Sequence, residues 1–343
     1  MKALYKVAPG PGHMELREAP RPAPGPGQVV VRVKAAGICG SDLHIRAWDT
    51  QVPMNPPMIA GHEFSGVIEE LGSGVEGWQA GERVTAEPSY SVCGRCLWCR
   101  SGAYNLCPER RVMGFWADGA FAGYVRVPAE RLHRLPENVS FHEGALMEPF
   151  ACCVHGVLER TGIEAGELVV VTGPGTIGLL AMQVARACGG RVVVVGKGVD
   201  AHRLDVAREL GADHAVNVDD GDPKEMVMDL SGGVGADVVL ECSGAPAAVD
   251  VGLDLVRRQG RYTQIGLFGR PVTVDLERIA YKELRVTGSY AQRWTAWKRA
   301  LTLLESGSVR LKPLISDVLP LSAWEQGFRK LERKKGLKVL LEP

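Results

Sequence analysis

The second half of the chain alternates two patterns of hydrophobic and polar positions. Short apolar runs, of which 192–195 is an unbroken stretch of valines, are typical of strands buried on both faces of a parallel sheet. Between them lie stretches whose apolar residues recur every three or four positions, as expected for helices packed on such a sheet. The predicted strands are 168–172, 191–195, 214–218, 236–241 and 261–266, and the predicted helices are 176–188, 201–210 and 246–257. This alternation predicts a doubly wound α/β domain.

The chain up to about residue 150 carries short β-rich runs, including 28–34 and 64–70, which are separated by Pro and Gly clusters such as 20–27. This predicts a β-rich domain with long loops. Two later helical patterns, 294–305 and 322–332, and a short strand, 337–341, are expected to pack back onto it. Because 343 residues exceed what one core usually holds, we expect two domains. They are residues 1–153 completed by 292–343, and residues 154–291.

Composition argues against several classes of function. Forty Lys and Arg residues balance forty Asp and Glu residues, so no overall field exists to hold a phosphate backbone or an anionic membrane surface. No run approaches the roughly 18 apolar residues of a membrane span, and the first residues have no apolar core like that of a secretory signal. We expect a soluble, cytoplasmic protein that acts on a small molecule.

A glycine pattern marks the start of the α/β domain. Gly173, Gly175 and Gly178 form a G-x-G-x-x-G motif, with Thr176 and Ile177 before its last glycine. The motif follows a predicted strand and opens a predicted helix, whose N-terminal N–H groups favour a pyrophosphate. Glycines that serve packing alone are the alternative. The strand and helix context favours binding of a dinucleotide.

The choice between NAD and NADP depends on the segment after the next predicted strand. An acidic residue there would bind the ribose hydroxyls of NAD, and Asp200 could reach back to do so. Lys197 and Arg203 could instead bind the 2′-phosphate of NADP. A solvated loop with Asp200 as a helix N-cap is the third interpretation. The sequence favours NAD and leaves NADP open.

Four of the nine cysteines, Cys93, Cys96, Cys99 and Cys107, fall within fifteen residues. Four thiolates on one short loop can close tetrahedrally around Zn²⁺. An iron–sulfur cluster shares the C-x2-C-x2-C start, but the long gap to Cys107 argues against it, and the expected compartment argues against disulfides. Because four thiolates leave no open position, we expect this zinc to be structural.

Three further segments supply ligands of mixed type: Cys39 in G-I-C-G-S-D-L-H, His62 and Glu63 in G-H-E, and Glu148 in M-E-P. Each is weak alone, because a single Cys or His is more often a packed residue than a ligand. Together they offer a thiolate, an imidazole and two carboxylates. Such a set could form a second, open zinc site with one position left for a substrate oxygen.

In this combination and order the motifs resemble the zinc-containing medium-chain dehydrogenase/reductase family, in particular its sorbitol and threonine dehydrogenase branches. The resemblance covers essentially the whole chain and implies a β-rich, GroES-like catalytic domain beside a Rossmann domain. It implies that Cys39 and His62 bind a catalytic zinc, with Glu63 and Glu148 as direct or exchanging ligands. It also implies that Asp42 orients His62.

The same resemblance gives roles to residues near the substrate and the cofactor. Ser41 would hydrogen-bond the substrate oxygen and His44 would pass its proton towards solvent. Ser243, Ile265 and Gly266 would line the nicotinamide side. Alternatives without a function stay open: His44 as a surface residue after a turn, Asp42 as a helix N-cap, and Glu148 as a solvated carboxylate. The glycines beside Ser243 and Ile265 could be loop residues needed for turns. Cys152 and Cys153, although close to Glu148, are interpreted as small buried residues.

The sequence predicts a zinc-dependent, NAD(P)-linked dehydrogenase with two zinc ions per chain and a secondary alcohol, in particular a sorbitol-like polyol, as substrate. The tract 148–155 resembles the sorbitol branch, whereas His44 with Trp48 resembles the threonine dehydrogenases. L-threonine and butanediol therefore stay open as substrates. Arg285 and Tyr290 are candidate polyol contacts. A non-catalytic nucleotide-binding protein is the alternative from another class, and a homo-oligomer, in particular a tetramer, is expected from pairing at 284–288.

Overall fold

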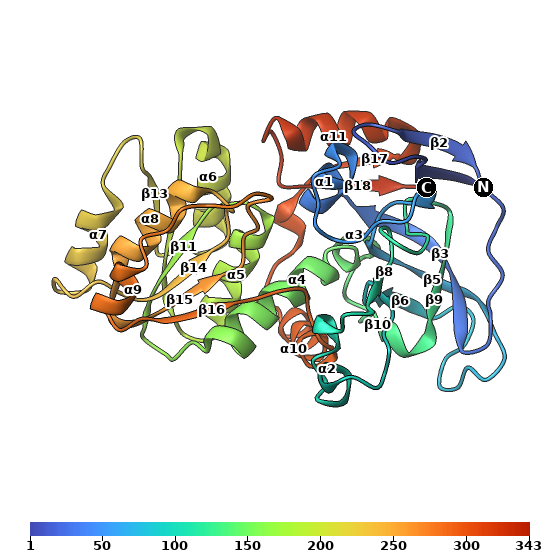
Figure 1. Cartoon of the computed structure of the whole chain (residues 1–343), viewed down its shortest axis with the longest axis horizontal. Coiled ribbons are helices and arrows are strands. Elements are labelled where there is room, and N and C mark those ends of the chain that lie inside the picture. Colours follow the sequence, from blue (N-terminus) through green and yellow to red (C-terminus); the bar gives the residue numbers. More distant parts are fainter. The chain divides into compact units, whose positions relative to one another are not determined.

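A computed structural model of the protein describes residues 1–343, which form two units (Figure 1). The first consists of Met1–Glu148, Gln292–Leu301 and Leu314–Pro343, and the second of Pro149–Ala291 and Thr302–Pro313. These ranges differ from the expected domains at 149–153 and 302–313. The second difference has a local cause, because the Gln183 side chain donates to the Arg310 carbonyl at 3.1 Å and accepts from its N–H at 2.8 Å.

The first unit is built on a seven-stranded sheet of order β10-β6-β5-β3-β18-β17, with β9 added to β3. Its last strand, β18, runs antiparallel to β3, and Gly37 on β3 lies opposite Glu63 on β5. The helices and strands of this unit are β1 (Lys2–Lys6), β2 (Met14–Glu18), β3 (Gln28–Gly37), α1 (Gly40–Ala47), β4 (Met58–Ile59), β5 (Glu63–Leu71), β6 (Arg83–Ala86), β7 (Ser89–Ser91), α2 (Leu97–Arg100), β8 (Arg111–Val112), β9 (Tyr124–Pro128), β10 (Leu132–Arg134), α3 (Phe141–Gly144), β17 (Ile315–Pro320), α11 (Trp324–Glu332) and β18 (Lys338–Glu342). Two helices continue from one unit into the other, α4 (Met147–Val154) and α10 (Trp294–Glu305).

The second unit is a six-stranded parallel sheet of order β13-β12-β11-β14-β15-β16 with helices packed against it (Figure 1). Its elements are β11 (Leu168–Thr172), α5 (Thr176–Ala187), β12 (Arg191–Gly196), α6 (Ala201–Glu209), β13 (His214–Asn217), α7 (Pro223–Leu230), β14 (Ala236–Glu241), α8 (Pro246–Leu255), β15 (Val256–Gln264), α9 (Glu277–Tyr281) and β16 (Arg285–Gly288). A π-helix, His155–Thr161, precedes the first strand. The predicted doubly wound α/β domain is confirmed.

The order of these strands determines where a ligand binds. The chain starts in the middle of the sheet at β11, extends to β13 on one side and then returns to add β14 to β16 on the other. The strand order therefore reverses between β11 and β14, and open α/β sheets bind ligands at the carboxyl ends of the strands at such a point. Val170, Val193 and Val239 are fully buried in the core of this sheet.

Some element bounds differ from the sequence pattern. Strand β15 begins at Val256, earlier than the predicted 261, because the ladder with β14 shifts register between Ala236 and Val238 and Gln259 takes a positive φ of 55°. Such an irregularity lets a strand continue past residues that break the apolar alternation. No helix is both long and apolar enough to cross a membrane.

Candidate active site and metal centres

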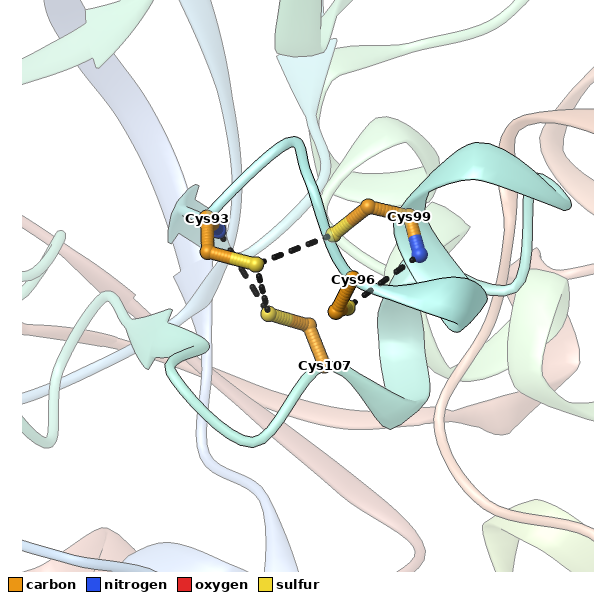
Figure 2. A group of neighbouring side chains, drawn as sticks. All are labelled: Cys93, Cys96, Cys99 and Cys107. Atoms are coloured by element: carbon orange, nitrogen blue, oxygen red, sulfur yellow. Dashed lines mark hydrogen bonds between the residues drawn. The ribbon is translucent and has the colours of Figure 1, made fainter.

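The four clustered cysteines converge on one point. The Sγ atoms of Cys93, Cys96, Cys99 and Cys107 all lie within 4.8 Å of one another (Figure 2). Cys93 Sγ is 3.9 Å from Cys99 Sγ and 3.6 Å from Cys107 Sγ. A tetrahedron with Zn–S bonds of about 2.3 Å has edges of about 3.8 Å, so the cluster matches a closed Zn²⁺ site.

Backbone groups of the loop favour thiolates in this cluster. The N–H of Cys99 donates to Cys96 Sγ and the N–H of Cys93 donates to Cys107 Sγ, both at 3.4 Å. Hydrogen bonds from the N–H groups of Arg95 and Cys96 lower the pKa of Cys93 to about 6. Since the thiolate is the form that binds zinc, these hydrogen bonds prepare Cys93 for the metal, whereas burial raises the pKa of Cys99 to about 12.

A buried carboxylate attaches the cysteine loop to the sheet. Tyr104, between the third and fourth cysteines, donates its hydroxyl to Glu87 at 2.5 Å, and His133 Nε2 lies 3.2 Å from the other oxygen of Glu87. The His133 ring stacks on Trp297, with ring centres 4.7 Å apart. Burial, followed by the charge of Glu87, raises the pKa of Tyr104 well above its ordinary value. These contacts join residues that belong to no recognisable sequence motif.

A second cluster forms in the same unit from residues far apart in the sequence. Cys39 Sγ, a ring nitrogen of His62 and a carboxylate oxygen of Glu63 lie within 4.8 Å of one another. Cys39 is the N-cap of α1, and its N–H donates to Asp42 Oδ2 at 2.8 Å. Thiolate, imidazole and carboxylate together suit Zn²⁺, and three ligands leave a position open. This second donor set therefore fits a catalytic metal.

The polar neighbours of His62 orient its ring. Ser41 Oγ is 3.3 Å from His62 Nε2, and Asp42 Oδ1 is 3.6 Å from His62 Nδ1. Burial acts to lower the pKa of His62, but the charge of Asp42, followed by Cys39 and Glu148, outweighs it and raises this pKa to about 10. Burial also raises the pKa of Asp42 itself to about 6. The imidazole is therefore held between a carboxylate on one side and Ser41 and Cys39 on the other.

Glu63 takes part in a buried ion pair that the sequence analysis missed. Lys338 Nζ, on the last strand, is 2.9 and 2.7 Å from the two oxygens of Glu63 and donates to the Ile38 carbonyl at 3.1 Å. Burial acts to lower the pKa of Lys338, but the charge of Glu63 outweighs it and raises the pKa. A side chain at Gly37 would place Cβ 2.3 Å from Glu63 Oε2, so this glycine leaves room for the carboxylate.

Glu148 lies outside the cluster of three ligands. It is buried at the start of α4, where Gln292 Nε2 donates to its Oε1 at 3.0 Å. Burial raises the pKa of Glu148, with the charge of Glu63 adding to this effect and that of His62 opposing it. Gln292, which is only 1% exposed, is a second residue that the sequence analysis missed. Its position directly before α10 carries no recognisable motif.

The remaining candidate substrate and proton-transfer residues lie on α1 and at the two ends of β16. His44 is half-exposed on α1, and its Nδ1 lies 2.8 Å from Asp49 Oδ1. Tyr290 follows the carboxyl end of β16 and is 41% exposed. Arg285, suggested as a polyol contact, begins β16 opposite Arg261 and lines a polar cavity of about 520 Å³ there. That suggestion is wrong, because the amino end of a parallel strand points away from the ligand edge.

The glycine loop has the geometry that dinucleotide binding requires. Gly173 has a positive φ of 91° directly after β11, and Gly175 is the N-cap of α5. A Cβ on Gly178 would lie 1.9 Å from the Gly173 carbonyl oxygen, so only glycine allows this approach of helix to strand. Thr176 and Ile177 form the first turn of α5, and the N-terminal turn of a helix is the end that favours an anion such as a pyrophosphate.

The segment after β12 has no acidic residue at the end of the strand, which is Gly196. Asp200 Oδ1 accepts from Arg203 at 3.0 Å, and its Oδ2 accepts from the Lys197 N–H at 3.3 Å. The Lys197 side chain is exposed. The carboxylate of Asp200 is thus engaged within its own turn, and a basic residue lies on each side of it.

Ser243, Ile265 and Gly266 come together at the carboxyl ends of β14 and β15. The N–H groups of Ile265 and Gly266 both donate to the Glu241 carbonyl at 2.8 Å. A Cβ on Gly173 would lie 2.5 Å from Ser243 Cβ, so the Ser243 loop touches the glycine loop directly. The three residues therefore border the reversal point of the sheet.

With this fold and these two ligand sets, the chain belongs to the zinc-containing medium-chain dehydrogenase/reductase family. Residues 25–137 match the alcohol dehydrogenase GroES-like domain, and residues 176–306 match the zinc-binding dehydrogenase domain. The protein is a zinc-dependent, NAD(P)-linked alcohol dehydrogenase of the sorbitol and threonine dehydrogenase-like branch.

Relatives with similar sequences and structures cover the whole chain. A sorbitol dehydrogenase of Halalkalibacterium halodurans is 46% identical over 100% of this chain and 99% of its own length. An L-threonine 3-dehydrogenase of Bacillus velezensis is 38% identical over 100% of this chain and 99% of its own. The crystal structure of a zinc-binding dehydrogenase from Sinorhizobium meliloti, bound to NADP, superposes with a TM-score of 0.90 at 34% identity, covering 100% of this chain and 99% of that one.

Proposed function

We propose that the protein oxidises a polyol of the sorbitol type at a secondary alcohol, with Cys39, His62 and Glu63 holding the catalytic zinc and Glu148 beside them. The observation that carries this proposal is the convergence of Cys39, His62 and Glu63 within 4.8 Å. The cysteine loop offers four ligands and a closed site, whereas these three leave a position for substrate. The 46% identity to a sorbitol dehydrogenase supports the choice of polyol.

Zinc bound at this site would act as a Lewis acid that eases removal of the alcohol proton, while the nicotinamide would accept the hydride. The chain itself supplies the route for the proton. Ser41 and His44 are three residues apart on α1, the spacing of neighbours on one helix face. Ser41 Oγ lies beside His62, and the half-exposed His44 ring is held by Asp49. The proton passes from the substrate to Ser41, then to His44 and solvent.

Two other substrates deserve direct comparison with sorbitol. L-threonine is favoured by His44 and Trp48, which resemble the threonine dehydrogenases, and by the 38% identity to a member of that group. Butane-2,3-diol presents the same secondary alcohol with fewer hydroxyls. A polyol needs polar partners beyond the reacting carbon, and Ser41, Glu148 and Tyr290 are the side chains we assign to this role.

For the cofactor, we infer that the segment after β12 accepts NADP as well as NAD. The carboxylate of Asp200 accepts hydrogen bonds from Arg203 and from the Lys197 N–H. Gly196, at the end of the strand, has no carboxylate that could bind the ribose hydroxyls of NAD. A 2′-phosphate would therefore meet the exposed Lys197 side chain, with Arg203, which is paired with Asp200, beside it. Lys197→Ala is expected to raise the KM for NADP far more than the KM for NAD. Equal changes would reject a phosphate contact.

We also infer a homo-oligomer, in particular a tetramer. Strand β16 lies at the edge of its sheet, where Val286 is 44% exposed. An open strand edge presents unpaired N–H and C=O groups that a second copy can pair with. Light scattering coupled to size-exclusion chromatography tests this, and a monomeric mass at micromolar concentration contradicts it.

The decisive experiment measures zinc per chain and cofactor reduction on the same preparations. Sorbitol, xylitol, butane-2,3-diol and L-threonine are each offered with NAD and NADP, and Cys39→Ser serves as the matched variant. We expect about two zinc ions per chain and the highest kcat/KM with a polyol.

Each other outcome has a definite meaning. A higher kcat/KM with L-threonine or butane-2,3-diol than with either polyol identifies that compound as the preferred substrate. About one zinc ion per chain in wild type, with no turnover of any alcohol, removes the catalytic assignment of Cys39, His62 and Glu63.

A further inference from the structure

Glu241 is a fully buried carboxylate at the reversal point of the second unit's sheet. It is the last residue of β14, and its neighbours across the ladder are Thr172 at the end of β11 and Gln264 at the end of β15. The proposed function uses none of its side-chain atoms. A buried charge at this edge of the sheet requires an explanation, because burial of an ion is costly.

All hydrogen-bond partners of the Glu241 side chain are neutral donors. The N–H of Ser243 donates to Oε1 at 2.8 Å, and the N–H of Gly244 reaches Oε1 at 3.1 Å and Oε2 at 3.2 Å. The Ser243 hydroxyl donates to Oε1 and Gln264 Nε2 donates to Oε2. No Lys, Arg or His forms an ion pair with this carboxylate. Its negative charge is therefore solvated by dipoles but not cancelled by a cation.

The surroundings of the carboxylate are packed against the cofactor loop. A Cβ on Gly266 would lie 2.6 Å from Glu241 Oε2 and 2.3 Å from the Gly244 nitrogen. A Cβ on Gly173 would lie 2.5 Å from Ser243 Cβ. The loop held by Glu241 thus lies against the first glycine of the dinucleotide motif. Any side chain at Gly266 or Gly173 would therefore force its neighbours to move.

This location matters because the nicotinamide ring changes charge during the reaction. The oxidised ring is a cation and the reduced ring is neutral, whereas the rest of the dinucleotide is the same in both forms. Ser243 and Gly266, which we place on the nicotinamide side, lie against the Glu241 carboxylate, and the N–H of Ile265 donates to the backbone carbonyl of Glu241. A fixed anion there attracts only the oxidised form, and the attraction is stronger in a buried site than in water.

We propose that Glu241 is a positioning residue with an electrostatic function: its buried charge makes the protein bind NAD(P)⁺ more tightly, relative to NAD(P)H, than the same loop without the charge would. This inference rests on the proposed function, because it requires the nicotinamide at this edge of the sheet. A purely structural role for Glu241 would affect both cofactor forms equally. The ratio of the two dissociation constants therefore separates the two roles.

The experiment compares Kd for NAD⁺ and NADH, and for NADP⁺ and NADPH, without substrate, by calorimetry and by the fluorescence of the reduced forms. In Glu241→Gln the oxidised-to-reduced Kd ratio is expected to rise about fivefold, as loss of one screened charge interaction predicts. Ser243→Ala removes hydrogen bonds of the loop but keeps the charge. This variant is expected to weaken binding of both the oxidised and the reduced cofactor and to leave the ratio of their Kd values within about twofold of wild type.

A second pair of variants tests the charge without altering Glu241. Gln264→Lys places a cation on the carboxylate and is expected to shift the ratio in the same direction, whereas Gln264→Met is the control of similar length. An unchanged Kd ratio in Glu241→Gln and Gln264→Lys overturns the inference, even if both variants lose affinity for the two cofactor forms equally. The proposed function stands in either case. If wild type binds neither form of either cofactor, the proposed function fails together with the inference.

Discussion

The two candidate metal centres of the first unit differ in how the chain builds them. The cysteine loop takes four identical ligands from fifteen residues, and three of its four cysteines are only partly buried. The open site takes unlike ligands from separate segments, and its ligand Glu63 and the neighbouring Asp42 are fully buried. The first centre is specified by spacing along the chain and the second by the packing of the sheet.

This difference follows from what each centre has to do. A closed thiolate site needs only its own loop, whose N–H groups stabilise the sulfur charges. An open site must hold its ligands in place while one position stays free, so it needs a rigid surrounding structure. Lys338 and Gln292, from the end of the chain, supply that structure for Glu63 and Glu148. Substitutions in the cysteine loop and around the open site therefore test whether each centre depends on its own loop or on the packing around it.

The largest effect is expected from removing a ligand of the open site. Cys39→Ser should lower kcat/KM by about 1,000-fold or more, because loss of the metal removes several kcal/mol of charge stabilisation. Zinc should fall from about two ions to about one per chain by elemental analysis. Conversely, Cys99→Ser should lose the zinc of the cysteine loop, and its melting temperature should be lower than that of wild type. Loss of both zinc ions in Cys39→Ser would show that the centres are not independent.

Breaking the buried ion pair should reduce stability strongly. Lys338→Met leaves the Glu63 carboxylate of the zinc-free protein buried without a cation, which should lower the free energy of unfolding by about 3 to 5 kcal/mol in urea titrations of chelator-treated protein. Adding Glu63→Gln should restore much of this loss. Lys330→Met is the control, because the Lys330–Asp317 pair is more exposed and should contribute about 1 kcal/mol or less. Equal costs for the two lysines would contradict the role of burial.

A smaller effect is expected from the contact to Glu148. Gln292→Leu removes the donor to a buried carboxylate, a loss of about 1.5 to 3 kcal/mol, and should lower kcat/KM about tenfold or somewhat more in steady-state kinetics. Gln183→Leu is the matched control, because this glutamine binds only the backbone of Arg310. It should lower stability and leave kcat/KM within about twofold. The same loss of kcat/KM in both variants would argue against positioning of Glu148.

The smallest effect should come from the attachment of the cysteine loop. Tyr104→Phe removes one hydrogen bond to Glu87 and should reduce the free energy of unfolding by about 1 to 2 kcal/mol, measured by thermal unfolding. Zinc release to a chelator should become faster. Tyr90→Phe, which loses a longer contact to Gln28, is the control. If Tyr104→Phe leaves both measurements unchanged, the loop is held by its metal alone.

The sequence predicted the parts of this protein that depend on neighbours along the chain. The strands and helices of the α/β domain follow from their apolar periods, and the glycine motif follows from the strand before it and the helix after it. Arg285 shows the limit of such reasoning. Arg285 and Tyr290 are both polar side chains that could contact a polyol, but Arg285 begins β16 and Tyr290 follows its carboxyl end, so the two lie at different ends of the strand.

The sequence by itself determined the fold class, the closed cysteine centre and the cofactor loop. The fold class follows from apolar periods, the cysteine centre from the spacing of four thiols, and the cofactor loop from backbone geometry that only glycine allows. Only the tertiary structure decided which charges meet. Lys338 reaches Glu63 because β18 pairs with β3, Gln292 reaches Glu148 from the start of α10, and Glu241 is buried among neutral donors at the sheet's reversal point. The Lys338–Glu63 and Gln292–Glu148 contacts join residues 275 and 144 positions apart and leave no local pattern, because they arise from strand order and packing.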